Sequence, residues 1–181
     1  MRIFGEEREE VNYSKFVFTL FTLFSLSFAS GNTDTNKTFQ CLIENGFTEL
    51  QLSRNANGQF ESFIQLDNGD SLRVIIDMGS NRTLFDIKKI KKLKIEMKNS
   101  TMKLESITGK QDVKTADIRN IKIGKANTGP MTVHVTELDY LNKQLKAFGN
   151  NEIDALIGAD LLTIYSAVID VKNSKLYMRI K

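Results

Sequence analysis

The amino-acid sequence predicts a mainly β domain with two or three short helices. Apolar and polar residues alternate along much of the 181-residue chain, which is the period of half-buried strands. Turn compositions such as Asn55-Ala-Asn-Gly58 and Asp67-Asn-Gly-Asp70 separate these stretches. Two wholly apolar runs, at 74–76 and 155–157, are soon followed by glycine, as expected of buried strands that end in a tight turn. A chain of this length suits one domain with one core.

The composition indicates a globular protein rather than a disordered one. Hydrophobic residues make up 41% of the chain and charged residues 26%, with a single proline. The formal net charge of +3 is only mildly basic, and the basic residues are not interleaved with the aromatic residues that stack on bases. We therefore expect no nucleic-acid partner.

The first thirty residues have the pattern of a secretory signal peptide. Lys15 precedes an apolar run at 16–28, and small residues follow at 29–31. The run has 13 positions, fewer than the ~20 that span a bilayer. A buried core helix and a short membrane anchor are the alternatives. We expect residues 1–29 to be removed as a leader, which predicts an exported protein, periplasmic or secreted, with no stable membrane span afterwards.

Removal of the leader would leave an N-terminal extension at residues 30–46 and a folded domain at residues 47–181. The one cysteine, Cys41, lies in the extension and cannot form an internal disulfide. We expect it to be a buried thiol.

The first half of the domain is predicted to be a β-hairpin, a strand and a short amphipathic helix. Residues 47–52 and 60–66 form the hairpin, and the next strand ends at Asp77. Four apolar residues then recur at helical spacing, with lysines mostly on other faces. The apolar residues are Leu84, Ile87, Ile90 and Leu93, and the lysines are Lys88, Lys89, Lys91, Lys92 and Lys94. The lysines suit either a solvated helix face or binding to an anionic envelope surface.

The middle of the domain is predicted to be strands followed by a second helix. The pattern is strand-like from 94 to 135, with Gly109, Gly124 and Gly129 as turn residues. Thr136 looks like the N-cap of a helix that Gly149 can end. The apolar face of this helix consists of Leu138, Leu141, Leu145 and Phe148.

The C-terminal part predicts a buried strand, a brief helix and a hairpin. The strand at 153–158 closes on a glycine, and Asp160 can cap a helix at 161–165. Residues 167–171 and 176–180 then form the hairpin.

The inventory of reactive side chains narrows the chemistry to carboxylates. The single histidine, His134, alternates with valines in a predicted strand, and no nucleophile motif such as G-x-S-x-G accompanies it, which favours a structural or surface role over that of a catalytic base. One His and one Cys do not make a three- or four-ligand zinc site. No P-loop or dinucleotide glycine pattern is present. We expect no metal and no cofactor.

Asp77 lies at the buried end of a predicted strand, between an apolar run and Gly79. A carboxylate in this place must be hydrogen-bonded, paired or functional, because desolvating it alone is costly. Two carboxylates held close can share one proton and activate a water, one acting as base while the other supplies the proton.

The order of these elements resembles the retropepsin-like aspartic proteases, particularly the single-domain bacterial members with export signals. The resemblance runs from about Phe47 to Ile180 and rests on Asp77-Met-Gly-Ser80, on Leu156-Ile-Gly-Ala-Asp-Leu-Leu162 and on the closing strands. It implies a closed β-barrel. The implied site residues are the catalytic Asp77, the active-site loop residues Met78, Gly79 and Ser80, the structural glycine motif Leu156, Ile157 and Gly158, and the flap residues Ile107, Thr108, Gly109 and Lys110. An ordinary surface hairpin is the alternative to a flap.

The resemblance also implies a homodimer, because one chain has one such loop and two carboxylates need two chains. The expected function is that of an aspartic endopeptidase acting on peptides or unfolded proteins. In this family the residue after the catalytic Asp is normally Thr or Ser, whose hydroxyl bonds to the partner loop, and Met78 cannot donate that bond. A catalytically impaired relative that binds peptides or dimerises, with a structural Asp77, is the alternative.

Overall fold

The computed structural model describes residues 31–106 and 109–179, and its contacts divide the chain into two units, residues 1–41 and 42–181. The predicted leader lies outside the described residues, so leader removal and export stay predictions. Helix α2 (Gly31–Glu44) occupies most of the predicted extension. Cys41 is exposed on this largely polar helix, so the expectation of a buried thiol is wrong. Among the described residues, no helix is both long enough and apolar enough to cross a membrane.

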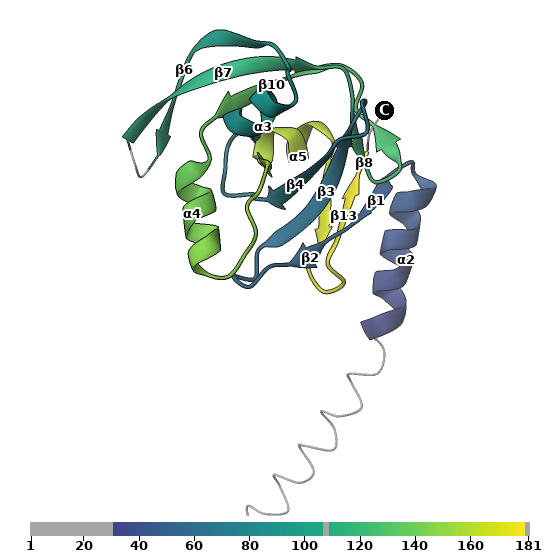
Figure 1. Cartoon of the computed structure of the whole chain (residues 1–181). Helices are drawn as coiled ribbons and strands as arrows, with labels where there is room; N and C mark the ends of the chain where they lie inside the picture. Colours follow the sequence, from purple (N-terminus) through teal and green to yellow (C-terminus); the bar gives the residue numbers. More distant parts are fainter. Residues whose placement is uncertain (1–30, 107–108, 180–181) are drawn as a thin grey trace, which may run out of the picture. The chain divides into compact units, whose positions relative to one another are not determined.

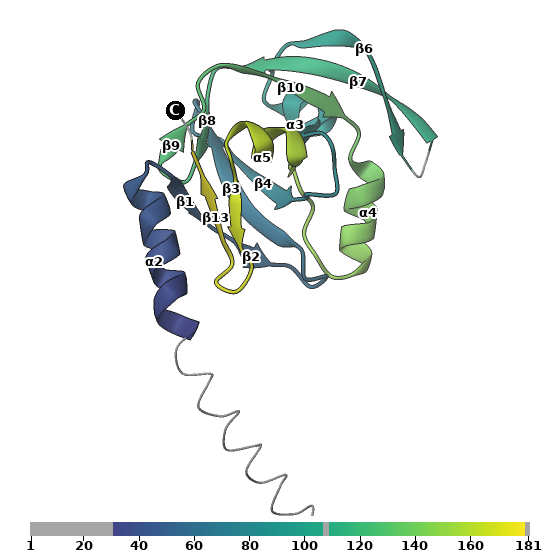
Figure 2. The same ribbon diagram turned by 180° about the vertical axis from the view of Figure 1, so that it is seen from behind.

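A small antiparallel sheet joins the start of the domain to its end (Figures 1 and 2). Its order is β1 (Thr48–Gln51), β13 (Lys175–Met178) and β12 (Val168–Asp170), which confirms the C-terminal hairpin. The predicted N-terminal hairpin is wrong for β1, because only the short β2 (Ser53–Arg54) pairs with β3 (Phe60–Leu66). Pairing of β1 with β13 instead buries Leu50 in the core that also holds Leu176 and Met178 of β13.

A ten-stranded sheet forms the rest of the domain and has the order β6-β7-β10-β5-β11-β4-β3-β8-β9, with β2 paired to β3. Its remaining strands are β4 (Ser71–Ile76), β5 (Leu84–Asp86), β6 (Met97–Ser106), β7 (Gly109–Ile118), β8 (Ile121–Ile123), β9 (Ala126–Asn127), β10 (Met131–Thr136) and β11 (Ala155–Ile157). The strand order of the described residues has two ends, β6 and β9, so closure into a barrel stays a prediction. The mainly β class is confirmed.

Strand β11 inserts between two strands from the first half of the domain. It is parallel to β4 and antiparallel to β5, with Leu156 opposite Ile75 and Leu84. Because β11 and β4 run side by side in the same direction, their C-terminal ends meet. The register therefore brings Gly158 to the loop that starts at Asp77.

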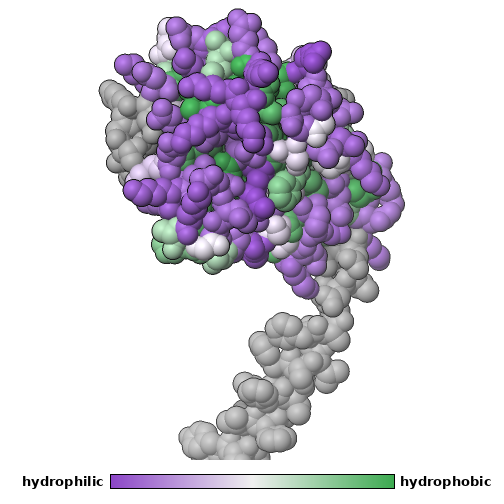
Figure 3. All heavy atoms as spheres, in the orientation of Figure 1, coloured by the Kyte–Doolittle hydropathy of each residue, from purple (hydrophilic) through white to green (hydrophobic). Residues whose placement is uncertain are grey.

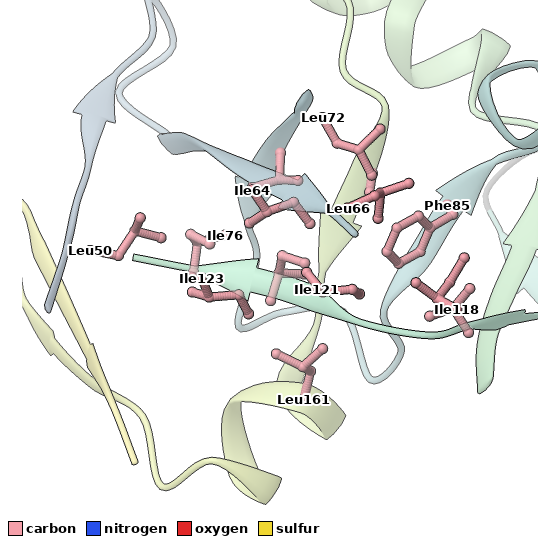
Figure 4. Close-up of a cluster of buried hydrophobic side chains, with 14 of the residues drawn as sticks. Leu50, Ile64, Leu66, Leu72, Ile76, Phe85, Ile118, Ile121, Ile123 and Leu161 are labelled. Carbon is pink, nitrogen blue, oxygen red and sulfur yellow. The ribbon is translucent and has the colours of Figure 1, made fainter. Parts of the chain in front are cut away.

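The main core fills the space between the two sheets and helix α5 (Ala159–Ile164). Side chains from several strands converge there with Leu161 from the helix, as Figure 4 shows. Phe85 on β5 is fully buried, and so are Leu72 and Val74 on β4. The alternation within β4, whose even-numbered residues enter this core, leaves its odd-numbered residues on the opposite face.

Helix α4 (Asp139–Ala147) covers that opposite face with a second apolar cluster. Leu138 and Leu145 pack there against Ile75, Ile153 and Leu156. The cluster confirms most of the predicted helix face.

Three details of the predicted helices are wrong. Leu84 belongs to β5 and precedes α3 (Ile87–Lys92), whose N-cap is Asp86. Thr136 is the last residue of β10 and not an N-cap, because its hydroxyl donates across the sheet to the carbonyl oxygen of Asp112 at 3.3 Å. Phe148 is 64% exposed, because it is the C-cap residue of α4, where the chain leaves the helix before Gly149 at φ +78°.

The face of the domain seen in Figure 3 is largely hydrophilic, with apolar residues scattered over it. Large apolar side chains that are at least half exposed among the described residues are Phe63, Met78, Phe148, Ile164 and Val171. Single exposed apolar residues are common on soluble proteins, so position decides which of them matters. Met78 differs from the others because it is the neighbour of the candidate catalytic carboxylate.

Candidate active site

Asp77 directly follows β4 and is anchored on both sides of its peptide unit. Its backbone N–H donates to the carbonyl oxygen of Ile157 at 2.9 Å, and its carbonyl oxygen accepts from the Ser80 N–H at 3.2 Å. The residue is half-buried, and its Oδ1 accepts from the Gly79 N–H at 2.9 Å. The charge at the end of this strand is therefore held by a backbone donor within its own loop.

Gly79 makes room for this hydrogen bond. A Cβ at position 79 would lie 3.1 Å from Asp77 Oδ1, which is closer than an ordinary van der Waals contact. The glycine after Asp77 thus allows the backbone to approach the carboxylate closely.

Gly158 packs against the loop that starts at Asp77 and has no room for a side chain. A Cβ there would lie 2.4 Å from the carbonyl carbon and oxygen of Arg82, and 2.9 Å from the carbonyl oxygen of Ser80. The neighbouring Ala159 N–H donates to that same Ser80 oxygen at 2.8 Å. The segment Leu156, Ile157 and Gly158 therefore supports the loop through direct backbone contact.

Thr83 and Asp160 complete this contact, and no sequence pattern indicates a role for Thr83. Asp160 Oδ1 accepts from the Thr83 hydroxyl at 2.7 Å and from the Thr83 N–H at 2.9 Å. The Thr83 hydroxyl in turn accepts from the Gly158 N–H at 3.0 Å. The prediction that Asp160 caps the last helix is wrong as well. The structure places it in the first turn of α5, whose N-cap is Gly158, and Oδ1 also accepts from the Leu161 N–H at 2.7 Å.

The two other predicted loop residues point in different directions. Met78 is 65% exposed, so its thioether fills no gap inside the chain. The Ser80 hydroxyl donates to the carbonyl oxygen of Arg82 at 2.8 Å and so stabilises the loop backbone. In a single chain, this hydroxyl is therefore used within the loop.

The predicted flap lies on the hairpin of β6 and β7, at the edge of the large sheet (Figure 1). Gly109 opens β7 opposite Ser106, and Lys110 lies opposite Glu105. Ile107 and Thr108 are outside the described residues. The hairpin itself is confirmed, its pairing shifts register between Asn99 and Lys103, and its role as a flap stays a prediction.

Two further titratable side chains, His134 and Asp86, lie on strands β10 and β5 of the large sheet. His134 lies opposite Leu84 and Thr115 in the sheet, and its Nδ1 is buried with no hydrogen-bond partner among these residues. Asp86 is buried, which raises the pKa of its carboxyl, although the Lys88 and Lys89 N–H groups that it accepts from lower it. No group of three or more described His, Cys, Asp or Glu side chains is arranged to hold a metal ion.

Comparison with known protein families gives one match. A family model described as aspartyl protease matches residues 64–161, which include Asp77 and Gly158. No curated protein matches the chain.

Three solved structures are similar to this chain. A retropepsin-like aspartic protease from Rickettsia conorii has 19% identity and a TM-score of 0.52, with 72% of this chain and 98% of that one covered. The EIAV protease in complex with the inhibitor HBY-793 has 13% identity and a TM-score of 0.45, covering 62% and 92%. The retroviral protease-like domain of Ddi1 from Leishmania major has 14% identity and a TM-score of 0.45, covering 66% and 87%. The first likeness gives the chain a retropepsin-like fold, and the match of the family model shows that it belongs to the aspartyl protease family.

Proposed function

We propose that the protein is an exported aspartic endopeptidase that hydrolyses peptide bonds with a pair of Asp77 carboxylates, one from each chain of a homodimer. The observation that carries the proposal is the loop at the end of β4. Asp77 is held there by the Gly79 N–H, and the loop rests on the side-chain-free Gly158. These contacts hold the carboxylate in one orientation, and general acid–base catalysis requires a group that is held in this way.

Each chain brings one carboxylate of this kind. The second Asp-x-Gly sequence of the chain, Asp67-Asn-Gly69, is the turn between β3 and β4, and Asp67 forms an ion pair there with Arg119 at 2.9 Å. A dyad therefore needs Asp77 from two copies, related by a twofold axis. Met78 beside the carboxylate is exposed, so its side chain is available for contact with a second chain.

In the proposed dyad, the two carboxylates share one proton. The ionised carboxylate takes a proton from a water whose oxygen adds to the peptide carbonyl carbon, while the protonated carboxyl donates to the carbonyl oxygen. The carboxyl that now holds the proton transfers it to the peptide nitrogen, the C–N bond breaks, and the other carboxylate takes a hydroxyl proton from the collapsing tetrahedral intermediate, so that the dyad again holds one proton. Activity should therefore fall at high pH, where the dyad loses this shared proton.

The substrate would be a peptide or an unfolded segment in extended form. The hairpin of β6 and β7 lies at the edge of the large sheet, where a strand-like peptide can add to exposed backbone groups. We propose that this hairpin closes over the peptide as a flap.

Cleavage of an unfolded protein tests the proposal. The purified full chain should cleave denatured casein at mildly acidic pH, and a hydroxyl-containing mimic of the tetrahedral intermediate should block the reaction. Light scattering with the bound mimic should report twice the chain mass. An active monomer would contradict the shared dyad.

Sequencing of the N-terminus of the envelope-fraction protein tests the export proposal.

Met78 favours a second candidate function, that of a non-catalytic peptide-binding or dimerising relative. A thioether cannot donate the hydrogen bond that a Thr or Ser hydroxyl provides. Peptide binding and dimerisation without cleavage, in the wild type and in Met78→Thr, would support this candidate.

A further inference from the structure

We infer that Thr83 and Asp160 are positioning residues that hold the Asp77 loop in its catalytic orientation. The inference rests on the proposed function for its kinetic consequences and on contacts within the chain for its structural ones. Neither residue needs to touch a substrate for this role, because both act through the loop that carries Asp77.

Three contacts hold the loop from 77 to 83 against the segment from 157 to 161. Two of them are bonds between backbone groups, from the Asp77 N–H to the Ile157 carbonyl oxygen and from the Ala159 N–H to the Ser80 carbonyl oxygen. These two bonds do not depend on the identity of any side chain. The third contact, at the far end of the loop, is made by the side chains of Thr83 and Asp160.

The protons in this third contact have one possible arrangement. Thr83 accepts the Gly158 N–H on its hydroxyl oxygen, and a backbone N–H can only donate. The single hydroxyl proton of Thr83 is then free to point to Asp160 Oδ1, which lies 2.7 Å away and as a carboxylate oxygen accepts. The Thr83 hydroxyl thus accepts from the Gly158 N–H and donates to the Asp160 carboxylate, and neither bond can run in the opposite direction. We call this pair of hydrogen bonds the relay.

Burial makes this relay sensitive to substitution. Thr83 is only 5% exposed, and Gly158 is buried as well. If the hydroxyl is removed, the Gly158 N–H loses its acceptor in a place that water does not reach, and Asp160 loses its shortest contact with the loop. The loop is expected to move so that these groups find new partners. Because Gly79 and Asp77 belong to the same loop, the carboxylate then changes orientation.

Valine and serine separate the hydroxyl of Thr83 from its shape. Thr83→Val keeps the branched shape and removes the relay, whereas Thr83→Ser keeps the hydroxyl and removes a methyl group. The chain also offers a matched control, since Thr132 donates from its hydroxyl to Asp117 Oδ1 at 2.7 Å on exposed strand residues. Thr132→Val breaks the same kind of Thr–Asp bond away from the Asp77 loop.

Hydrogen exchange of the full chain without substrate tests the structural part, whatever the catalytic activity is. Thr83→Val should speed exchange of the Gly79 and Ser80 amides by roughly tenfold or more relative to the wild type, while Thr83→Ser and Thr132→Val should not. Faster exchange confined to the Gly158 amide, with Gly79 and Ser80 unchanged, would overturn the inference.

Steady-state kinetics test the catalytic part. Thr83→Val should lower kcat by roughly tenfold to a hundredfold with little change in KM, because a misplaced carboxylate affects the transition state more than binding. Thr83→Ser should restore most of kcat, and Thr132→Val should match the wild type.

Should Thr83→Val fail to fold, Asp160→Asn is the substitute, since it keeps an acceptor oxygen but loses the charge and should give an intermediate kcat. An active wild type with unchanged kcat in Thr83→Val or Asp160→Asn would overturn the positioning role and leave the proposed function standing, whereas an inactive wild type with the predicted exchange pattern would overturn only the proposed function.

Discussion

Two copies of the same short pattern, Asp-x-Gly, have different structures in this chain. At Asp67-Asn-Gly69 the pattern forms an open hairpin turn, in which Gly69 adopts φ +86° and a Cβ would meet no atom within 4 Å. At Asp77-Met-Gly79 the glycine is needed for room instead, since a Cβ would press on Asp77 Oδ1. The first glycine satisfies a backbone angle and the second a close approach. The chemical role of an Asp-x-Gly pattern therefore depends on the residues that pack against it.

The polar contacts of the two loops differ in the same way. The carboxylate of Asp67 faces outward to the exposed Arg119, and Asn68 exchanges hydrogen bonds with Asp70 inside the turn. The Asp77 carboxylate accepts from its own loop, and that loop is bound to a segment about 80 residues further along the chain. One loop is a local turn, and the other is held by tertiary contacts.

The largest expected difference between the two loops is in catalysis. Asp77→Asn should lower kcat/KM by roughly 10²- to 10⁴-fold, because an amide cannot accept and return a proton. Asp67→Asn should leave kcat/KM unchanged and serves as the matched control. Peptidase assays on both variants measure this difference, and circular dichroism verifies that both fold. An inactive Asp67→Asn with an active Asp77→Asn would show that Asp77 is not the catalytic carboxylate.

The glycines of the two regions should differ in stability. Gly158→Ala should lower the free energy of unfolding by about 3 kcal/mol, because the new methyl group would overlap the Arg82 backbone. Gly69→Ala should lower it by about 1 kcal/mol, since only the positive φ is unfavourable there. Urea unfolding of both variants measures the difference. Equal losses would show that the close approach at Gly158 is relaxed in solution.

Position 78 tests whether the Asp77 loop faces a second chain. Met78→Thr should leave the free energy of unfolding of the chain within about 0.5 kcal/mol, because the side chain is exposed and its shortening leaves no cavity. The new hydroxyl should tighten the dimer by roughly 1 kcal/mol per site and raise any peptidase activity. Sedimentation equilibrium measures the dimer dissociation constant. A weaker dimer without a gain in rate would refute the missing-hydroxyl explanation.

The smallest effect concerns Asp86, a third carboxylate at the end of a strand, where burial raises the pKa. A raised pKa means that the folded chain holds this proton more tightly than the unfolded chain does. The wild type should therefore lose stability relative to Asp86→Asn as the pH rises from the ordinary aspartate range through the folded pKa. Urea unfolding of both proteins over acidic to neutral pH measures this difference. A wild type that gains stability relative to Asp86→Asn as the pH rises would mean that the pKa is lowered instead.

The sequence was informative where local pattern and structure agree. The strand that ends at Asp77, the turn at 67–70 and the C-terminal hairpin follow from alternation and turn composition, and the structure contains all three. Thr136 was misread because a threonine suits both an N-cap and a strand end, and only its neighbour across the sheet decides. The exposure of Phe148 likewise depends on the residue at which the helix ends, which hydrophobic spacing fixes poorly.

The support of the candidate site was beyond local reading. Thr83 and Asp160 are 77 positions apart, and nothing in their immediate sequence indicates that they meet. Their contact follows from the insertion of β11 between β4 and β5, which is a feature of the sheet order. The available signal was Gly158 at the end of a predicted buried strand, with the acidic Asp160 two positions later.

Subunit mixing tests the central claim, that one active site needs Asp77 from two chains. Wild-type chain is mixed with an equal amount of Asp77→Asn chain, allowed to exchange subunits, and assayed for cleavage at fixed total protein. If the dyad spans two chains, only dimers of two wild-type chains are active, and the mixture should retain about one quarter of the wild-type rate. A rate of about one half, in proportion to the wild-type chain present, would show that each chain works alone and would contradict the shared dyad.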